Sequence, residues 1–421
     1  MLINHEVNQL PKKIAMISMH ASPLAQLGGD KSGGMNLYIK EISLRLSKLG
    51  LQVDIFTRYE LNDSSEIIEM GPGVRLVHIK AGPNKKILPA KLNRHVPAFI
   101  EGVKNFAIFE NNRYDIIHSH YWLSGLIGAS LSKEWNINHV TMFHTLSLAK
   151  EIALGKGSTV PVRMKAEKEI ITSANKIICS SYHEKELICS LSEISEKKVE
   201  VIPLAVDNNI FKPNDLILSR NKLDIEIDSK VILNVSRLDP VKGIDILIKA
   251  IAKIKNKKGI VLKIIGGEIK ASQYKVYLQE LVKSLNLTHH VQFLGSIAHG
   301  DLVKYYNASN LVVVPSRYES FGLVALEAFA SGKPTIASNV GGLSSIINNG
   351  SNGFLVESEN VDELSAKIEE VLNNINLSSK IGFQAYLDAK NYSWDHTAHS
   401  VFQVYKDSYK YFNNIKHVAS Y

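Results

Sequence analysis

The sequence predicts an α/β protein with two Rossmann-like domains, each a doubly wound parallel sheet, that face a shared cleft. Three observations support this prediction. Short apolar runs alternate with helical patterns in the first half of the chain, the alternation lapses into a polar stretch at Asp207–Asp228, and it then resumes. Strands that alternate with helices indicate a parallel sheet. A chain of 421 residues is also too long for one ordinary hydrophobic core.

The first domain is expected over residues 1–206. Its strands are predicted from apolar runs at Lys13–His20, Val53–Thr57, Val74–Ile79, Asp115–His118, His139–Phe143, Lys176–Ser180 and Val199–Ile202. Helical patterns separate several of them, at Met35–Leu49, Val96–Phe109, Ser124–Trp135, Val162–Ala174 and Tyr182–Cys189.

The second domain is expected over residues 207–392, because the polar stretch with Pro213 is typical of a domain boundary. Its strands are predicted at Val231–Ser236, Ile260–Ile265, Val291–Leu294, Leu311–Val314, Thr335–Ala337 and Phe354–Val356, with helices at Gly243–Ile254 and Ser272–Leu285. Residues 393–421 are expected to form a separate C-terminal helix. Aromatic residues recur at helical spacing within Ser393–Phe412, so this helix should pack on another part of the protein.

The composition indicates a cytoplasmic enzyme that binds anions. The net charge is +8 and the pI about 9.1, which favours phosphates and nucleotides. No long basic run or basic-aromatic interleaving is present, so nucleic acid is not expected. The two cysteines, Cys179 and Cys189, are too few for a disulfide framework or a zinc cluster. No apolar stretch is long enough to span a membrane, and Met1–Lys13 lacks the apolar core of a signal peptide.

The segment from Leu311 to Glu327 is the most informative part of the sequence. A buried strand is expected to end at a Pro-Ser turn, and a helix is expected to begin near Phe321-Gly322, with Glu319 and Glu327 on either side of that start. The free amides of a helix start bind anions. This arrangement suits a nucleotide-sugar transferase, with a diphosphate on the amides and a carboxylate on the sugar. An ordinary strand-to-helix junction with two solvated acids remains an equal alternative.

Glycine pairs and cations follow other expected strands. Gly33-Gly34 ends the loop that follows the first strand, and further pairs occur at Gly266-Gly267 and Gly341-Gly342. Such turns let backbone approach a ligand closely, although a flexible surface loop is the simpler alternative. Arg237 and Lys242 join a strand to a helix in the second domain, where both could reach a pyrophosphate. Two exposed cations on a loop would give the same pattern.

Histidines follow strands of the first domain. His118 and His120 come at the end of one strand, and His144 follows the next. Two histidines without a nearby third ligand favour no metal site, and His144 could be a core residue, a hydrogen-bonding group or a base. The carboxylates between Asp224 and Asp228 fall in the polar stretch, where a solvated face is expected.

Taken together, these segments resemble the retaining glycosyltransferases of family 4, which have the two-Rossmann GT-B architecture. The resemblance runs from Ile14 to about Phe412. It is strongest to the members that transfer N-acetylglucosamine from UDP-N-acetylglucosamine to inositol 3-phosphate, with sucrose-phosphate synthases and aminocyclitol transferases as neighbours. The matching segments are His20–Gln26, Gly33–Asn36, Asp54–Arg58, His118–Gly125, His144–Leu146 and Glu319–Glu327.

The resemblance implies donor-binding roles for part of this set. Arg237 and Lys242 match the pair that grips the donor diphosphate, Glu327 the acid on the ribose, and Glu319 the acid on the sugar hydroxyls. His144 matches a histidine near the sugar ring. The remaining donor-side residues are the loop glycines and the helix start: Gly33, Gly34, Ser320, Phe321, Gly322 and Leu323.

The acceptor side is expected to hold a phosphorylated polyol or sugar. The residues that match acceptor contacts are Asn36, Lys85, Tyr121, Thr145 and Arg163. Two departures fall on this side: the loop Ala81–Lys86 is short, which leaves either Lys85 or Lys86 as the matching lysine, and the helix after Arg163 lacks the expected Cys-Glu-Gln-Gln run. The acceptor assignment therefore has less support than the donor assignment.

The expected reaction keeps the anomeric configuration and uses a UDP-sugar as co-substrate, without a metal or other cofactor. Fixed cations and helix-end amides would stabilise the leaving diphosphate. No carboxylate is evident for a double displacement, so the resemblance implies front-face substitution. The alternatives are a sucrose-phosphate or aminocyclitol hexosyltransferase and a catalytically silent nucleotide-sugar-binding protein. The resemblance also implies that the C-terminal helix crosses back to the first domain. The oligomeric state is left open, with a homodimer as one alternative.

Overall fold

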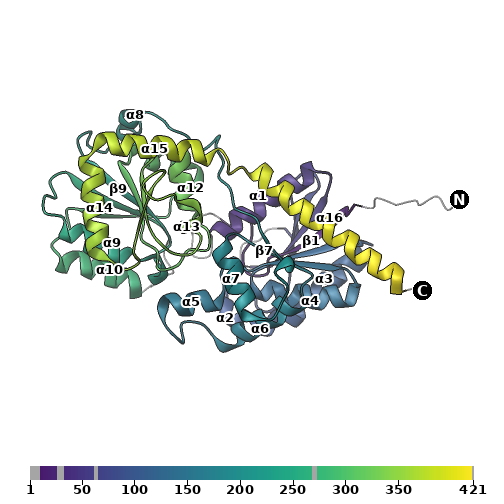
Figure 1. Ribbon diagram of the computed structural model, residues 1–421. Coiled ribbons are helices and arrows are strands. Elements are labelled where there is room, and N and C mark those ends of the chain that lie inside the picture. The colour runs from purple at the N-terminus through teal and green to yellow at the C-terminus, as the bar shows by residue number, and fades with distance from the viewer. Residues whose placement is uncertain (1–9, 26–32, 61–64, 268–272, 420–421) are drawn as a thin grey trace.

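The computed structural model of the chain describes residues 10–25, 33–60, 65–267 and 273–419. Within these residues two sheets form the centres of two lobes (Figure 1). The two Rossmann-like domains predicted from the sequence are therefore confirmed.

The first lobe contains a sheet of order β3-β4-β2-β1-β5-β6-β7-β8 in the described part of the chain. All neighbouring strands are parallel except β3, which is antiparallel to β4. The strands are β1 (Lys13–Ile17), β2 (Gln52–Arg58), β3 (Ile67–Gly71), β4 (Val74–Ile79), β5 (Ile116–His120), β6 (Asn138–Met142), β7 (Lys176–Cys179) and β8 (Val199–Val201). The helices are α1 (Gly34–Lys48), α2 (Pro89–Leu92), α3 (Val96–Phe109), α4 (Trp122–Trp135), α5 (Ser147–Leu154), α6 (Pro161–Ser173) and α7 (Tyr182–Leu191).

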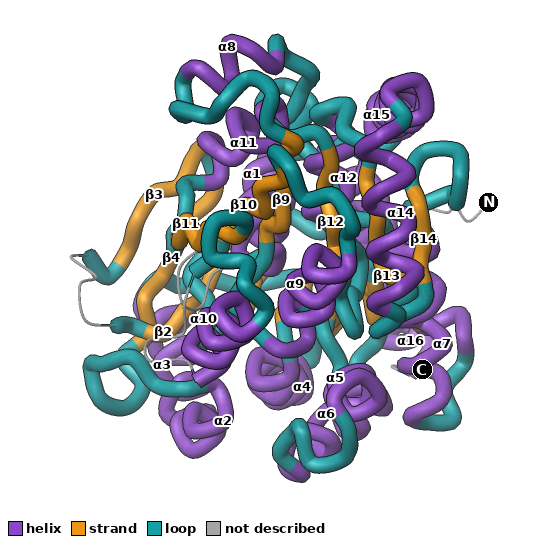
Figure 2. The backbone as a smooth tube through the Cα atoms, turned by 90° about the vertical axis from the view of Figure 1, so that its left-hand side faces the viewer, coloured by secondary structure: helices purple, strands orange, loops and turns teal. Residues whose placement is uncertain are grey.

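The second lobe contains a parallel sheet of order β11-β10-β9-β12-β13-β14. Its strands are β9 (Lys230–Val235), β10 (Ile260–Ile265), β11 (Val291–Gly295), β12 (Leu311–Val314), β13 (Thr335–Ser338) and β14 (Phe354–Val356). Its helices are α8 (Leu216–Asn221), α9 (Ile244–Lys253), α10 (Gln273–Ser284), α11 (Leu302–Ala308), α12 (Leu323–Ala330), α13 (Leu343–Ile346), α14 (Val361–Asn373) and α15 (Ile375–Ala389). Figure 2 views this lobe end-on, with α9 and α14 in front of the strands.

Strand alternation divides the first lobe into two cores. Ile14 and Met16 of β1 pack in the same core as residues of α1 and of the C-terminal helix α16 (Trp394–Ala419), whereas Ala15 and Ile17 face the core under α3, α4 and α6. Successive side chains of a strand point to opposite faces, so each strand contributes to both cores. The sheet is thus buried on both faces, as a doubly wound sheet requires.

Helix α16 crosses from the second lobe to the first. In Figure 1 it continues from α15 and lies along the first lobe beside α1. The side-chain amide of Asn138 in β6 donates a hydrogen bond of 3.0 Å to the carbonyl of Ser408. The terminal helix therefore completes the first lobe's core, as its aromatic pattern predicted.

Three of the differences between the structure and the sequence predictions concern segments held by long-range contacts. Strand β3 was not predicted, since it is an edge strand whose Ile67 is exposed. The polar boundary stretch contains α8, capped by Asp215, and the buried Arg220 donates to the carbonyl of Ala308 at 3.1 Å and to Asn310 at 2.7 Å. Strand β5 also continues through His118 to His120, past its predicted end. Each segment owes its structure to long-range contacts that local patterns do not reveal.

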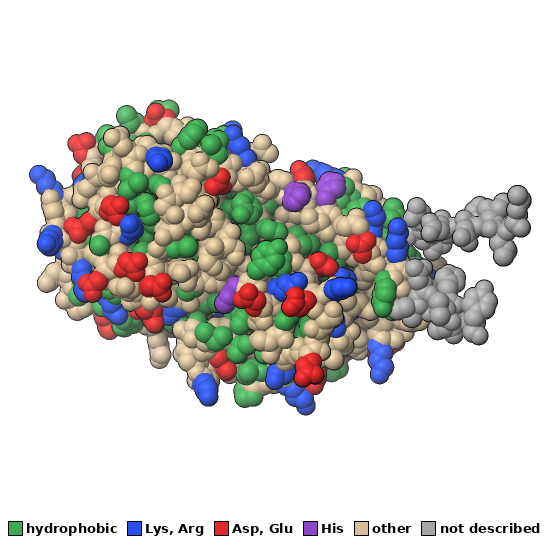
Figure 3. Space-filling model, viewed as in Figure 1, with side chains coloured by type: hydrophobic (Ala, Val, Ile, Leu, Met, Phe, Trp, Pro, Cys, Tyr) green, Lys and Arg blue, Asp and Glu red, His purple; other side chains and the backbone are tan. Residues whose placement is uncertain are grey.

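Charged side chains of both signs are interspersed on the face shown in Figure 3, so the net charge of +8 is not gathered into one patch there. Among the described residues, no helix has both the length and the apolar character needed to cross a bilayer.

Candidate active site

The loops that follow the strands of the two lobes meet in the middle of the molecule. Ser320, just before α12, donates a hydrogen bond of 2.6 Å to the carbonyl of His144, which follows β6. The hydroxyls of Ser180 and Ser181 each donate to the carbonyl of Ser320 at 3.1 Å. A Cβ built on Gly34 would lie 2.7 Å from Leu323. The starts of α1 and α12 thus approach each other across the lobes, where ligands bind in open α/β sheets.

Two of the predicted donor-side residues form an ion pair. The Lys242 ammonium lies 2.6 Å from a carboxylate oxygen of Glu319, and both side chains are about one-fifth exposed. Lys242 ends the short 3-10 helix η3 (Pro240–Lys242), and Glu319 lies in the loop between β12 and α12. Arg237 is more exposed and lies 3.7 Å from Asp239. The sequence interpretation assigned Lys242 to the donor diphosphate and Glu319 to the donor sugar. In the structure the two side chains contact each other directly.

Arg317 fixes the loop that carries Glu319. Its guanidinium donates two hydrogen bonds to Asp245 of α9, at 3.0 and 2.9 Å, and one of 2.6 Å to the carbonyl of Pro240. Burial raises the pKa of Asp245, but Arg317 and Tyr274 outweigh it and hold that pKa below its ordinary value. A bidentate Arg–carboxylate pair is geometrically specific. Sequence analysis gave Arg317 no role, because its partner lies 72 residues away.

The glycine pair at Gly341-Gly342 packs against the same loop. The amide of Gly342 donates to the carbonyl of Glu319 at 2.8 Å, and a Cβ on Gly342 would lie 2.3 Å from the Ser320 carbonyl oxygen. Gly341 has a φ of +51°. These glycines allow backbone to approach backbone, whereas the sequence interpretation was an approach of backbone to ligand.

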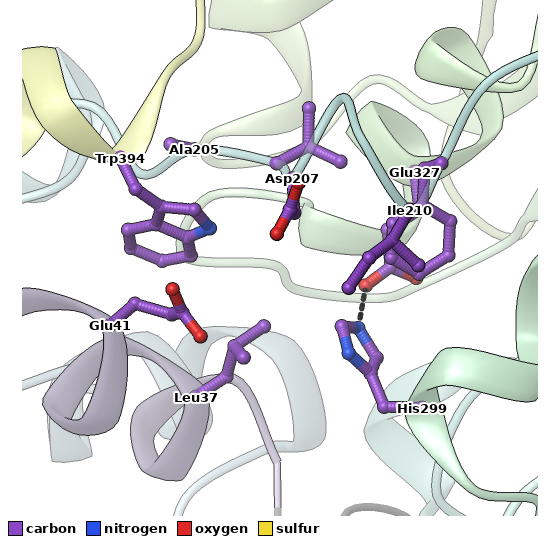
Figure 4. Close-up of a pocket in the computed structure, with 10 residues that line it drawn as sticks. Leu37, Glu41, Ala205, Asp207, Ile210, His299, Glu327 and Trp394 are labelled. Atoms are coloured by element: carbon purple, nitrogen blue, oxygen red, sulfur yellow. Dashed lines mark hydrogen bonds and ion pairs between the residues drawn. The ribbon is translucent and has the colours of Figure 1, made fainter. Parts of the chain in front are cut away.

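Glu327 lies one turn into α12 and already has two partners. His299 contacts one carboxylate oxygen at 2.7 Å, and the hydroxyl of Tyr306 donates to the other at 2.7 Å. Figure 4 shows this carboxylate at the wall of a small cavity that is also lined by Glu41 of α1 and by Trp394. Burial lowers the pKa of His299, but the neighbouring Glu327 outweighs it and raises that pKa above its ordinary value. His299 was missed because it follows no recognised motif.

Three of the predicted acceptor-side residues gather in the first lobe. The guanidinium of Arg163 lies over the ring of Tyr121, 4.8 Å from its centroid, and donates to the Tyr121 hydroxyl at 3.1 Å. It also donates to the carbonyl of Thr145 and, at 2.7 Å, to Glu167. Glu167 is fully buried and accepts further hydrogen bonds from Ser147. Glu167 thus orients Arg163, a role that only the i, i+4 spacing could have indicated.

Lys150 of α5 is a further cation that sequence analysis missed. Burial lowers its pKa; Asp239 raises it, and Arg163, Arg237 and Lys242 lower it again. Helix α5 also contacts η3, which carries Lys242. Lys150 is therefore within electrostatic range of cations from both lobes. Helix α5 itself was not predicted, so no sequence signal placed this lysine.

His144 lies at the junction of the two lobes. It is half-buried, and its backbone is left-handed with a φ of +59°, which is uncommon outside glycine. Its ring lies 3.1 Å from His120, nitrogen to nitrogen. Burial and, to a lesser extent, His20 lower the pKa of His144 to about 3, so the ring is neutral at physiological pH.

The remaining predicted residues lie on the loops around this centre. Asn36 is buried, and its amide holds the start of α1 by donating to the carbonyl of Ser22 at 2.7 Å and accepting from the amide of Gly33 at 3.1 Å. Lys85 is exposed, and its carbonyl accepts a 2.7 Å hydrogen bond from the buried Arg58. None of the hydrogen bonds found among the described residues joins the Lys85 side chain to Arg163. Residues 26–32 of the glycine-rich loop lie outside the described residues.

Metal-binding geometry is absent from the described part of the chain, where no three His, Cys, Asp or Glu side chains are grouped to hold an ion. The acids Asp224, Glu226 and Asp228 are exposed, as expected for a solvated face. Cations of both lobes act on Lys150, and their charge favours anionic ligands at this junction.

Comparison with known proteins gives consistent matches over both lobes. Residues 32–209 match the family model described as "Glycosyltransferase Family 4", and residues 217–388 match "Glycosyl transferases group 1". The D-inositol 3-phosphate glycosyltransferase of Rhodococcus erythropolis is 34% identical over 411 residues, covering 96% of this chain and 93% of that protein. The enzyme of the same name from Acidothermus cellulolyticus is 34% identical over 408 residues, covering 94% and 91%. The solved structure of sucrose-phosphate synthase from Thermosynechococcus elongatus superposes with a TM-score of 0.88 at 31% identity, covering 94% of this chain and 98% of that one.

Proposed function

This chain belongs to the family 4 glycosyltransferases, and we propose that it transfers N-acetylglucosamine from UDP-N-acetylglucosamine to inositol 3-phosphate. The names of its relatives support the acceptor, since several with about one-third identity are D-inositol 3-phosphate glycosyltransferases. The donor rests on the resemblance of the loop around Glu319 to the family's donor site.

The observation that carries the proposal is the position of Lys150. Arg163 of the first lobe and Arg237 and Lys242 of the second all act electrostatically on this ammonium and lower its pKa. Each of these three side chains also has a carboxylate partner, and the positive charge that both lobes contribute around Lys150 favours an anionic ligand there. A donor diphosphate and an acceptor phosphate would supply such anions from both sides. A phosphorylated acceptor therefore fits this cleft better than a neutral one.

Each side of the cleft has a proposed task. Arg237 and Lys242 would bind the diphosphate, Glu319 the sugar hydroxyls, and Glu327 the ribose. Lys242 and Glu319 form an ion pair with an N–O distance of 2.6 Å. Donor binding would replace this ion pair by contacts to phosphate and sugar. An ion pair that solvent can reach contributes only about 0–1 kcal/mol, so we expect the exchange to cost little.

We further propose that the reaction retains configuration and requires no divalent metal. Charge grows on the diphosphate as the glycosidic bond breaks, and fixed cations stabilise it most in the transition state. Arg237, Lys242 and Lys150 would supply that charge. The departing phosphate would then take the proton of the acceptor hydroxyl on the same face of the sugar. Activity that persists undiminished in EDTA would support this, and activity restored only by Mg²⁺ or Mn²⁺ would refute it.

A second candidate is the synthesis of sucrose phosphate. The sucrose-phosphate synthase structure matches this chain at 31% identity over 94% of its length. Fructose 6-phosphate, like inositol 3-phosphate, would place one phosphate on the Arg163 cluster.

One experiment separates these candidates. The purified protein is incubated with UDP-, GDP- and ADP-sugars against inositol 3-phosphate, fructose 6-phosphate and aminocyclitols, and the products are weighed by mass spectrometry. We expect a product only with a UDP-sugar and a phosphorylated acceptor, with N-acetylglucosaminyl inositol phosphate as the main product. A product from an unphosphorylated acceptor alone would refute the assigned role of Arg163.

A further inference from the structure

A column of buried aromatic side chains connects the C-terminal helix to His144. The hydroxyl of Tyr405 on α16 is hydrogen-bonded to Nδ1 of His118 at 2.6 Å. The rings of His118 and His120 lie 4.2 Å apart, and Nδ1 of His120 contacts Nε2 of His144 at 3.1 Å. Tyr405 is thus connected to His144 by a series of side chains, each in contact with the next.

The alternation of β5 explains why this column exists. His118 and His120 are two residues apart in one strand, so both rings point to the face of the sheet that α1 and α16 cover. Ser119, between them, points to the opposite face and bonds His139 and Thr141. The rings meet Tyr405 from α16 and Tyr38 from α1 on the covered face. Only a helix that returns to this lobe could supply Tyr405.

Packing alone does not explain why these positions carry histidines. His118 and His120 are fully buried, and their Nε2 atoms have no hydrogen-bond partner among the described residues. Burial of an unpartnered polar atom destabilises a protein, whereas an apolar side chain of similar size would not. Burial also lowers the pKa of both histidines, so they are neutral. Neutral imidazoles form directional hydrogen bonds and can fix the orientation of a neighbour.

His144 is held from two directions. Its carbonyl accepts hydrogen bonds from Ser320 at 2.6 Å and from the Thr145 hydroxyl at 2.7 Å, which fix a left-handed backbone. Its ring is held by His120. The backbone is fixed by one set of contacts, and the ring is oriented by the hydrogen bond to His120 and by an edge contact with Tyr38, whose ring centroid lies 5.4 Å away.

We propose that Tyr405, acting through His118 and His120, is a positioning residue that sets the ring orientation of His144 for sugar transfer. The inference rests on the proposed place of His144 beside the donor sugar. It gives the returning C-terminal helix a task in the reaction: loss of one hydroxyl on α16 changes the geometry of the transfer centre.

The test replaces Tyr405 by Phe, with Tyr409→Phe as the matched control. Tyr409 lies one turn further along α16 and is half-buried in the same core. Tyr405→Phe keeps the ring and removes one hydrogen bond, so we expect kcat to fall about three- to tenfold with the KM of the donor little changed. Tyr409→Phe should leave kcat unchanged. Equal kcat values in the two variants would overturn the proposal.

A second measurement does not depend on substrate. Nitrogen-15 shifts of the His144 ring, assigned by their loss in His144→Gln, should change in Tyr405→Phe and stay constant in Tyr409→Phe. Unchanged His144 shifts in Tyr405→Phe would overturn the coupling even if kcat fell. If the wild-type protein transfers no sugar to inositol 3-phosphate, the proposed acceptor is wrong. The nitrogen-15 shifts of the His144 ring still test the column in that case.

A conservative replacement in the column separates positioning from packing. An Asn side chain can place its amide near the position of Nδ1, so His120→Asn should retain more kcat than His120→Leu. If His120→Leu were the more active variant, packing alone would explain the column and the proposal would fail.

Discussion

The two sides of the cleft are built differently. On the first-lobe side, Arg163 is bonded to Glu167, Tyr121 and a backbone carbonyl, so its orientation is fixed before any ligand arrives. On the second-lobe side, Lys242 is paired with Glu319, and Glu327 with His299. Arg163 thus has an anchor outside the proposed acceptor residues, the buried Glu167, whereas Lys242 and Glu319 of the proposed donor side hold each other.

The difference indicates how the two substrates would bind. An acceptor phosphate would meet a guanidinium that is already oriented, so little conformational freedom is lost on binding. A donor would have to replace the ion pair of Lys242 and Glu319. The same contrast appears in the histidines: burial lowers the pKa values of His118, His139 and His144 in the first lobe and keeps them neutral, whereas His299 of the second is paired with a carboxylate.

The largest expected effect concerns acid stability of the first lobe. Burial lowers the pKa of His118, His139 and His144 to about 3, from an ordinary value of 6.5. Below pH 6.5 the unfolded chain binds protons that the native protein does not, so the free energy of unfolding falls as pH falls. At pH 5 each histidine should remove about 2 kcal/mol. Urea unfolding at pH 7 and pH 5 measures this.

A pair of variants checks the assignment. His139→Gln should reduce the loss between pH 7 and pH 5, whereas His396→Gln, at an exposed position of α16, should not. Equal pH dependence in wild type and His139→Gln would show that the first lobe does not owe its acid sensitivity to buried histidines.

The second effect is catalytic and tests the donor side. Glu319→Ala should lower kcat about 10²- to 10³-fold, since a fixed polar contact at the reacting sugar is lost. The circular dichroism spectrum should not change. Glu359→Ala is the control, because this exposed carboxylate bonds Arg317 of the same loop at 2.7 Å. Near-normal turnover in Glu319→Ala would refute its role at the sugar.

The third effect tests the acceptor side. Arg163→Ala should raise the acceptor KM about 30-fold, which corresponds to about 2 kcal/mol for a charge-assisted contact to phosphate. Thr145→Ala should act in the same direction, and the donor KM should change little in either. Lys165→Ala, an exposed position on the same helix, should have no effect. Equal increases in the acceptor KM and the donor KM would contradict the assignment of Arg163 and Thr145 to the acceptor side.

The smallest effect has the opposite pH sign to the first. The pKa of His299 is raised above 6.5 by Glu327, so its stabilisation is complete below pH 6.5 and is lost as pH rises through the raised value. The loss should be about 1 kcal/mol or less and should vanish in His299→Gln. Thermal unfolding between pH 6 and pH 8.5 would show it. A stability that rises with pH in this window, and that His299→Gln abolishes, would contradict the ion pair.

Part of the site was predictable because its residues follow strands. Arg237, Lys242 and Glu319 come directly after apolar runs, and the carboxyl ends of parallel strands share one edge of a sheet. His118 and His120 were placed after their strand, since histidines interrupt an apolar pattern, but neutral histidines extend β5 inside the core. Lys150 lies several residues beyond β6 in a helix that was not predicted, so its place near the cations of both lobes was not foreseeable.

The sequence by itself determined the two α/β lobes, because hydrophobic periodicity acts over neighbouring residues and requires no knowledge of distant ones. The return of the C-terminal helix to the first lobe was implied by the family resemblance. Tertiary structure alone decided which polar groups meet. Lys242 and Glu319 are 77 residues apart, and His118 and Tyr405 are 287 apart. Hydrogen bonds and ion pairs act over a few ångströms of space, so these partners exist only once the strands, loops and final helix have brought them together.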